Sequence, residues 1–377
     1  MMDGPAPNLP LTILSFLLVI GILVFIHELG HYLAGRWFGV KAEAFSIGFG
    51  REVAGWTDKR GTRWKVGWLP LGGYVRFKGD MSPASKPDPE WLRMPPEERS
   101  QCFQAKPLWQ RAIIVAAGPI INFAFALLIF AAFFAAYGEY RTSTTLGEVQ
   151  GPAAAAGLRP GDTVKAIAGR EVDDFDDVRR FVILRPGQRV DVLAERGGET
   201  LLLPVTIGTR WEEDRFGNRY AMGQMGVRPD GYRQVPLSLT DIPGAALSRF
   251  GDTIELMTDS IAQIVTGRRS AKELGGPLRI AQVSGEQAMG GWQNLLLFMA
   301  LISINLGFIN LLPVPMLDGG HLAFYAVAGI RGRAPNPKTV ERAFRGGLAV
   351  LLALMVMVTL NDLAAFGLFS GLAGLIG

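Results

Sequence analysis

The chain has 377 residues, of which 49% are hydrophobic and 19% are charged, and its mean hydropathy of +0.23 is positive. This balance excludes an ordinary chain of two or three soluble domains and indicates a membrane protein with a soluble portion. The isoelectric point near 9.2 does not indicate a nucleic-acid partner, because the basic residues do not gather in one segment with interleaved aromatics. The single cysteine, Cys102, excludes an intramolecular disulfide.

The first predicted element is an apolar helix over residues 9–34, which is long enough to cross most of a bilayer. Its second half contains His27, Glu28 and His31 in a His-Glu-x-x-His pattern. Histidines at i and i+4 project from one helix face and can share a Zn²⁺, and the glutamate can take a proton from the attacking water. The alternative, a pair of core histidines in a buried helix, would leave clustered polar groups uncompensated. We interpret residues 1–41 as a retained membrane helix, since cleavage as a signal peptide would remove the motif.

Residues 42–80 predict a membrane-associated β-hairpin region. Apolar residues alternate on either side of a turn at 57–62, and Gly72 and Gly73 follow in the second strand. Strand backbone is tolerated at membrane depth only beside protein or a water-filled cavity, and a free edge there can pair with an extended substrate. Gly72 and Gly73 are therefore candidate substrate-binding residues, and a surface hairpin with no substrate role is the alternative. Residues 81–107 are expected to be a cytoplasmic connector.

Residues 108–137 predict the second span, and residues 138–236 a small domain with its core at 143–208. The stretch Ala156-Gly157-Leu158-Arg159-Pro160-Gly161-Asp162, followed by a helix near 174–185, resembles the PDZ domains of bacterial envelope proteases. The resemblance implies a groove beside the helix in which a peptide or a chain end adds as a strand.

A rigid cap without peptide affinity is the alternative for this domain. If the domain does bind chain ends, residues 144–147 are the expected carboxylate-binding loop.

Three further segments complete the chain. In residues 237–292, apolar side chains recur at three- and four-residue steps from Leu247 to Ile264, which predicts an amphipathic helix on the membrane surface or against the spans. Residues 293–320 predict the third span. Residues 321–377 predict a cytoplasmic loop and the fourth span.

The basic residues set the orientation of the four spans, which are predicted at residues 9–34, 108–137, 293–317 and 343–362. Residues 36–111 contain fourteen Lys and Arg residues and residues 331–345 contain five, whereas none precedes Arg36. The positive-inside rule places both segments in the cytoplasm. Both termini and the PDZ-like domain are then extracytoplasmic, and His27 and His31 lie near the cytoplasmic face.

A hydrolytic zinc site takes three protein ligands and keeps one position open, so a third ligand is required. Asp318 and His321 follow the third span after Pro313 and Pro315, which break the helix. Asp362, near the end of the fourth span, is a further candidate, and a membrane-interface residue is its alternative reading. Spacing does not choose between Asp318 and His321.

A resemblance to a known family distinguishes these two residues. The His-Glu-x-x-His of the first span, Gly118-Pro119 with Asn122 in the second, the stretch from Asn310 to Asp318 and the PDZ-like domain together resemble the site-2 protease family of intramembrane zinc metalloproteases. Within it, the chain is most similar to the bacterial regulator-of-sigma-E protease type. The match covers nearly the whole chain, with one departure, since members often carry two PDZ domains in tandem and residues 138–236 have room for one.

The resemblance implies a set of site residues. One Zn²⁺ per chain is held by His27, His31 and Asp318, and Glu28 is the catalytic residue. Asn310, Pro313 and Asn122 are implied to bind substrate. His321 then lies behind the ligands or at the cytoplasmic interface.

The expected fold is a polytopic α-helical membrane protein with about four transmembrane helices, a membrane-associated β-hairpin region and one extracytoplasmic PDZ-like α+β domain. The resemblance implies an intramembrane metalloendopeptidase in the bacterial inner membrane. It would cleave single-span proteins such as an anti-sigma factor after an upstream site-1-type protease, in regulated intramembrane proteolysis, or remnant signal peptides. The alternatives are a non-catalytic membrane PDZ scaffold or chaperone with a vestigial metal site, and a metal transporter, which would need polar residues in several spans.

Overall fold

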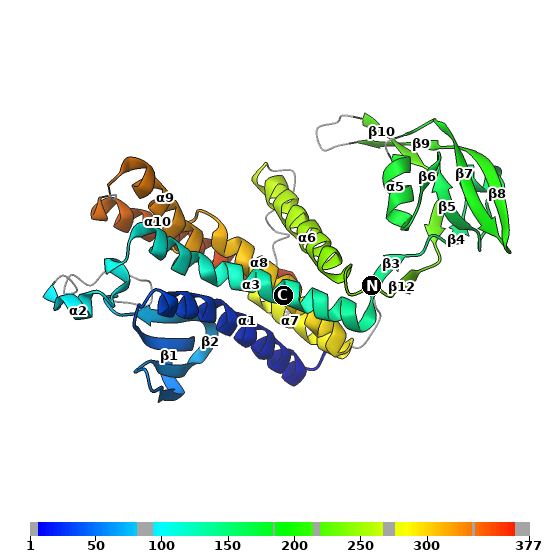
Figure 1. Cartoon of the computed structure of the whole chain (residues 1–377). Helices are drawn as coiled ribbons and strands as arrows, with labels where there is room; N and C mark the ends of the chain where they lie inside the picture. Colours follow the sequence, from blue (N-terminus) through cyan, green and yellow to red (C-terminus); the bar gives the residue numbers. More distant parts are fainter. Residues whose placement is uncertain are drawn as a thin grey trace, which may run out of the picture. The chain divides into compact units, whose positions relative to one another are not determined.

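A computed structural model describes residues 7–80, 93–183, 185–213, 219–266, 276–333 and 336–365 (Figure 1). The chain divides into two compact units. The first, which we call the helical unit, comprises Met1–Phe130 and Ala246–Gly377; the second, the sheet unit, comprises Ala131–Ala245.

Four helices are long and apolar enough to cross a membrane, with mean hydropathies from 1.9 to 2.8 in their most apolar windows. They are α1 (Leu9–Trp37), α3 (Leu108–Tyr137), α8 (Trp292–Leu311) and α10 (Pro337–Ala365). The prediction of four candidate spans is therefore confirmed.

The third candidate span ends earlier than the sequence indicated. α8 stops at Leu311, and α9 (Asp318–Arg331) begins after a turn. Pro313 and Pro315 lie in this turn and lack the N–H that a continuing helix would use, and Met316 has a φ of 85°. Asp318 is consequently the first residue of a new helix rather than the end of the span.

The helices α1 and α3 approach each other closely at Gly30. A Cβ at this position would lie 2.4 Å from the carbonyl oxygen of Ala117 and 2.7 Å from Ile121. Glycine therefore allows the two backbones to come within reach of each other's side chains. On the other side of α3, the Ser303 hydroxyl of α8 donates to the carbonyl oxygen of Asn122 at 2.8 Å.

The predicted hairpin is present as β1 (Ala42–Thr57) and β2 (Arg63–Phe77), which pair antiparallel. Asp58 builds the turn between them. Its carboxylate accepts hydrogen bonds from the N–H groups of Arg60 and Thr62 and from the Trp64 indole, at 2.8 to 3.0 Å. Side-chain bonds of this kind favour turns, which explains why the sequence reverses here.

The hairpin also folds back on itself. Ile47 of β1 is opposite both Gly73 and Val66 of β2, so the first half of β1 has a partner on each side. Gly48 and Gly50 make this bend possible, because their φ values of +83° and +84° are left-handed. The segment 73–77 is thereby left with β1 on one side only among the pairings of the described strands.

The base of the hairpin packs on α1 and α3, whereas its far half is exposed. Phe45, Val75 and Phe77 join a buried cluster that includes Tyr32 of α1 and Ile114 of α3. Beyond the bend the most exposed large apolar side chains are those of Val53, Trp56 and Trp68, which are 61–70% exposed.

The remaining helices of the chain are shorter or amphipathic. A helix is present over the predicted amphipathic stretch as α6 (Ile242–Val265), and the same segment contains a second helix, α7 (Pro277–Met289), which packs on α1. The segment before α3 contains α2 (Pro96–Arg99) and a 3-10 helix (Phe103–Ala105), and Cys102 is buried there. Residues 81–92 of the predicted connector and 366–377 of the last segment lie outside the described residues.

The sheet unit is built around a four-stranded antiparallel sheet in the order β6-β5-β7-β8, with α5 (Phe175–Ile183) packed on its core. Its strands and short helix are β3 (Glu139–Thr142), β4 (Leu146–Val149), α4 (Gly151–Ala155), β5 (Thr163–Ile167), β6 (Arg170–Glu171), β7 (Arg189–Arg196), β8 (Glu199–Thr206), β9 (Gly208–Glu213), β10 (Arg219–Gln224), β11 (Val227–Pro229) and β12 (Tyr232–Val235). The last two strands return to pair with the first two, β11 with β4 and β12 with β3. The unit thus needs residues beyond 208, where the predicted core ended.

One prediction about this unit and one residue of its PDZ-like stretch can be compared with the geometry. The predicted carboxylate-binding loop at 144–147 is not an open loop, because Thr144 is buried and its carbonyl oxygen accepts from Val164 N. Asp162, the last residue of the PDZ-like stretch, stabilises the fold of the unit. Its buried carboxylate accepts two hydrogen bonds from Arg196 of β7, at 2.6 and 2.7 Å. That this unit is a PDZ-like domain, and that it binds peptides, both stay predictions.

Candidate metal centre

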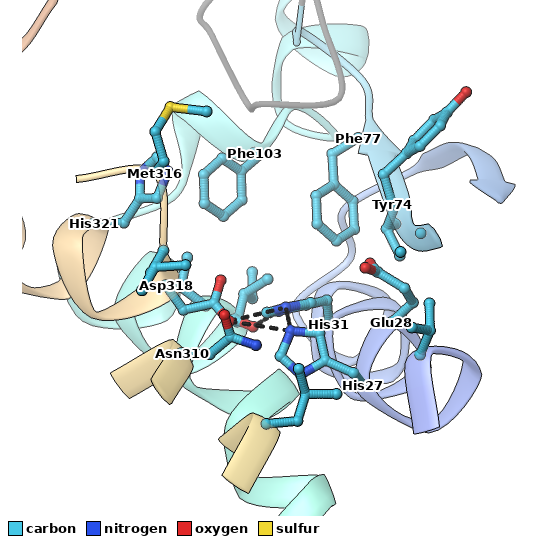
Figure 2. A pocket seen from close by; sticks show the side chains of 18 of the residues that line it. His27, Glu28, His31, Tyr74, Phe77, Phe103, Asn310, Met316, Asp318 and His321 are labelled. Atoms are coloured by element: carbon cyan, nitrogen blue, oxygen red, sulfur yellow. Dashed lines mark hydrogen bonds and ion pairs between the residues drawn. The ribbon is translucent and has the colours of Figure 1, made fainter. Parts of the chain in front are cut away.

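Three predicted ligands converge between α1 and the start of α9 (Figure 2). The His27 and His31 Nε2 atoms lie 3.3 Å apart, and Asp318 Oδ2 lies 3.2 Å from the first and 3.5 Å from the second. Ligand atoms held by one tetrahedral zinc at bonds of about 2.0–2.1 Å are about 3.3–3.4 Å apart. The spacing of these three atoms matches that geometry.

The backbone at the start of α9 is arranged to bring Asp318 to the histidines. A Cβ at Gly319 would lie 2.2 Å from the carbonyl oxygen of Leu311, and one at Gly320 would lie 2.3 Å from that of Val314. Only glycines allow the first turn of α9 to pack so closely on the preceding turn. The two glycines after Asp318 therefore position the ligand.

Helix α3 supplies the other wall of the centre through residues spaced four apart. The Ile114 carbonyl oxygen lies 2.9 Å from His31 Nδ1, and the Asn122 amide lies 3.1 Å from His27 Nδ1. Between them, a Cβ at Gly118 would lie only 2.3 Å from His31 Nε2. One face of α3 thus contacts both histidine rings.

These residues fit a zinc ion. The donor set of two imidazoles and one carboxylate is typical of hydrolytic zinc. Asp318 Oδ2 is buried, lacks a hydrogen bond of good geometry and approaches both Nε2 atoms, as a ligand of a shared metal would. Gly118 keeps the space beside Nε2 free of a side chain.

A cavity of about 300 Å³ opens onto the ligands. Glu28 lies on the side of the hairpin, near Tyr74, while His321 lies on the opposite side beside Met316, with Asn310 next to Asp318 (Figure 2). A Cβ at Gly73 would lie 3.1 Å from Glu28 Cγ, so the edge of β2 contacts α1 at the predicted catalytic residue. The cavity therefore presents the metal ligands, a carboxylate and a strand edge together.

The other predicted residues take different places. Gly72, Gly73 and Asn310 line the cavity, whereas Asn122 is fully buried behind His27 and Pro313 is exposed in the turn before α9. The cavity-lining residues identified for this pocket include neither Asn122 nor Pro313.

The two rejected candidates for the third ligand have roles of their own. His321 lines the cavity with its ring 4.8 Å from that of Phe344 in α10. Asp362 is buried and accepts hydrogen bonds from the N–H groups of Gly276 and Arg279, at 3.0 and 3.2 Å. A carboxylate at this position caps the first turn of α7 and offsets its dipole.

Sequence reasoning missed the contribution of α3 to the centre. Ile114 and Gly118 had no assigned role there, although Gly118 and Asn122 were noted as a motif. Their common spacing of four residues, which is also the spacing of His27 and His31, is the signal that could have indicated two facing helices.

The fold and the site together define a zinc hydrolase whose ligands lie on or beside apolar helices long enough to cross a membrane. Residues 15–354 match Peptidase family M50, and the chain belongs to this family. It is accordingly a metalloendopeptidase of the site-2 protease type.

Curated relatives agree over nearly their whole length. A protein of Agrobacterium fabrum, provisionally named a zinc metalloprotease, is 47% identical over 361 residues, which cover 94% of this chain and 96% of that one. A protein of Rhizobium meliloti with the same provisional name is 43% identical, over 94% of this chain and 97% of its own. Metalloprotease MmpA of Caulobacter vibrioides is 37% identical, over 96% and 98%.

Proposed function

We propose that this metalloprotease hydrolyses peptide bonds within the membrane-spanning segments of single-span proteins, such as an anti-sigma factor, or of remnant signal peptides. The observation that carries the proposal is the position of Glu28 and the two histidines within α1, a helix with a mean hydropathy of 2.8 over its most apolar window. A substrate must enter the apolar region to reach them.

The chemistry follows from the donor set and from the residues around the cavity. A zinc ion, when bound, polarises the scissile carbonyl and lowers the pKa of water to about 7. Glu28 takes a proton from the attacking water at its carboxylate and returns it to the nitrogen of the leaving amine. Asn310 and His321, on the far side of the cavity, are polar side chains that can hold the substrate carbonyl. The His321 ring nitrogens have no hydrogen bond among the described residues.

The hairpin supports a second part of the proposal, the unwinding of the substrate. A helical substrate hides its carbonyl groups in i to i−4 bonds, so it must become extended before attack. The segment 73–77 lines the cavity with Gly73, Tyr74, Val75 and Phe77, and among the described strands β1 pairs with only one of its edges. An added substrate strand would bring an extended peptide beside Glu28.

The sheet unit supports a proposal about substrate selection. We place this unit and both termini outside the cytoplasm of a bacterial inner membrane, on the distribution of basic residues. A cavity of about 250 Å³ lies between α5 and the segment 223–228, and β11 has β4 on one side only among the described strands. A chain end produced by an upstream protease could bind there, or the unit could exclude untrimmed substrates by its bulk.

The orientation can be tested by thiol labelling, although not through the natural cysteine. Cys102 is 0% exposed, so its failure to react would say nothing about the side of the membrane. In a Cys102→Ser background, Glu199→Cys should react with a membrane-impermeant maleimide in intact cells and Glu97→Cys should not. The reverse pattern would overturn the orientation.

Substitution of Glu28 by Gln tests the proposed activity. The variant should keep its zinc and retain bound membrane substrates that wild type cleaves, because the ligands are intact and only the proton carrier is lost. Crosslinked partners can be identified by mass spectrometry and then offered to the wild-type enzyme in detergent. Partners that wild type does not cut within their membrane segments would refute the proposal.

A further inference from the structure

The side chain that contacts His27 from behind is more than a packing residue. Asn122 is 0% exposed, and its amide Nδ2 lies 3.1 Å from His27 Nδ1. Its Oδ1 is also buried and has no hydrogen-bond partner among the residues that the structure describes. A buried amide oxygen without a partner is costly and calls for an explanation.

The orientation of this amide decides the tautomer of His27. An amide nitrogen donates, so Nδ2 facing Nδ1 leaves the imidazole proton on Nε2. That Nε2 is the atom that lies 3.2 Å from Asp318 Oδ2 and would have to present a lone pair to a metal. In this orientation His27 cannot serve as a ligand while neutral.

The other histidine shows the arrangement that a metal requires. His31 Nδ1 lies 2.9 Å from the carbonyl oxygen of Ile114, which can only accept. The proton of His31 is therefore held on Nδ1, and Nε2 is left with its lone pair. His31 is fixed as a ligand by the backbone of α3, whereas His27 depends on an amide that can present either of two atoms.

We propose that Asn122 is a positioning residue for the metal, and that its Oδ1 accepts the Nδ1–H of His27 when zinc is bound. The Asn122 Oδ1 that lacks a partner is the acceptor that the zinc-bound state needs. Rotation of the side-chain amide by about 180° exchanges Nδ2 and Oδ1 and brings Oδ1 to His27 Nδ1. Asn122 thus selects the tautomer that makes His27 a ligand. The proposal concerns the metal centre and no substrate, so a failure of the peptidase proposal would leave it standing.

Zinc affinity distinguishes this role from simple packing. Asn122→Asp supplies an obligatory acceptor of the same shape and should bind zinc at least as tightly as wild type. Asn122→Leu has a similar volume and no acceptor, and it should weaken binding by about 10–100-fold, the usual cost of losing a hydrogen bond behind a metal ligand. Affinity can be measured on the full chain in detergent by competition with a chelator of known affinity.

A control removes the neighbouring contact without touching His27. Ser303→Ala breaks the bond from α8 to the Asn122 carbonyl oxygen and should leave zinc affinity unchanged. Equal weakening by the Asp and Leu variants, or wild-type affinity in the Leu variant, would overturn the proposal.

The tautomer can also be read directly, because the chain has only three histidines. Nitrogen-15 spectra of histidine-labelled, zinc-loaded wild type, with the His321 signals assigned from His321→Gln, should show both ligand histidines, His27 included, protonated at Nδ1. A proton on His27 Nε2 in the zinc-loaded protein would overturn the proposal even if the Leu variant failed to fold.

Discussion

Gly118 is the residue of α3 whose substitution should most directly disable the metal centre. A Cβ at Gly118 would lie 2.3 Å from His31 Nε2, 2.5 Å from His31 Cε1 and 2.9 Å from His27 Cε1. The optimum separation of such atoms is about 3.5 Å or more. In Gly118→Ala the His31 ring must therefore move by about 1.2 Å, or α3 must retreat by a similar distance.

Neither movement is compatible with zinc binding. Metal–ligand distances tolerate changes of about 0.2 Å, several times less than the required shift. Loss of a bond behind a ligand weakens binding by about 10–100-fold, so displacement of the ligand itself should weaken it by more than about 100-fold. Retreat of α3 would separate it from α1 at Gly30, where the two helices pack closely, and would withdraw the Ile114 carbonyl oxygen from His31 Nδ1.

The measurement is the zinc content and affinity of the purified full chain, followed by cleavage of a membrane substrate. Gly21→Ala is the matched control, because Gly21 lies in α1 with nothing within 4 Å of its Cβ position. This control should keep its zinc and gain up to about 1 kcal/mol of helix stability. Stoichiometric zinc and wild-type cleavage in Gly118→Ala would refute the close approach of α3 to the histidines.

Two further predictions concern residues away from the ligands. His321→Phe keeps a ring against Phe344 but removes the ring nitrogens, so kcat should fall by about 10²-fold with zinc content unchanged, the usual cost of one donor to a developing charge. His321→Gln keeps a donor and should lose less; equal losses would indicate packing alone. In the sheet unit, hydrogen bonds from Arg196 hold the pKa of the Asp162 carboxyl below its ordinary value. The stabilisation from this pair is therefore complete above about pH 3.9, the ordinary pKa, and it is lost as the pH falls through the lowered pKa. Arg196→Met should destabilise the unit at neutral pH, measured by hydrogen exchange of the full chain, because the buried Asp162 carboxylate loses its charged partner. Lys165→Met, which breaks an exposed pair on the same sheet, should change stability by less than about 1 kcal/mol, and a similar effect of both variants would contradict the reasoning.

The parts of the structure that the sequence predicted depend on neighbours along the chain. The four candidate spans follow from the length of apolar runs, and the pairing of His27 with His31 follows from helical spacing. The hairpin turn follows from Asp58, whose side chain bonds only within the turn and to Trp64. The histidine pair and the turn are determined within about six residues, and each span within one continuous apolar run, so local sequence is informative for all three.

The remaining features depend on contacts between distant segments. Asp362 caps a helix that begins more than eighty residues earlier, so nothing near it in the sequence separates a helix cap from an interface residue or a ligand. Asp318 could not be chosen over His321 by spacing, because three residues on α9 place both on one side of the helix. The resemblance to a known family, and then the convergence of ligand atoms, made that choice.

The two histidines show how unequal two ligands of one metal can be. His31 receives its tautomer from a backbone carbonyl, which no substitution of a side chain in α3 can remove. His27 receives its tautomer from Asn122, a side chain that can present a donor as well as an acceptor. The hydrogen bond that fixes the tautomer can therefore be removed by a side-chain substitution in α3 only on the His27 side. The His-Glu-x-x-His motif does not show this difference. It identifies the two ligands but not the groups of α3 that set the tautomer of each one.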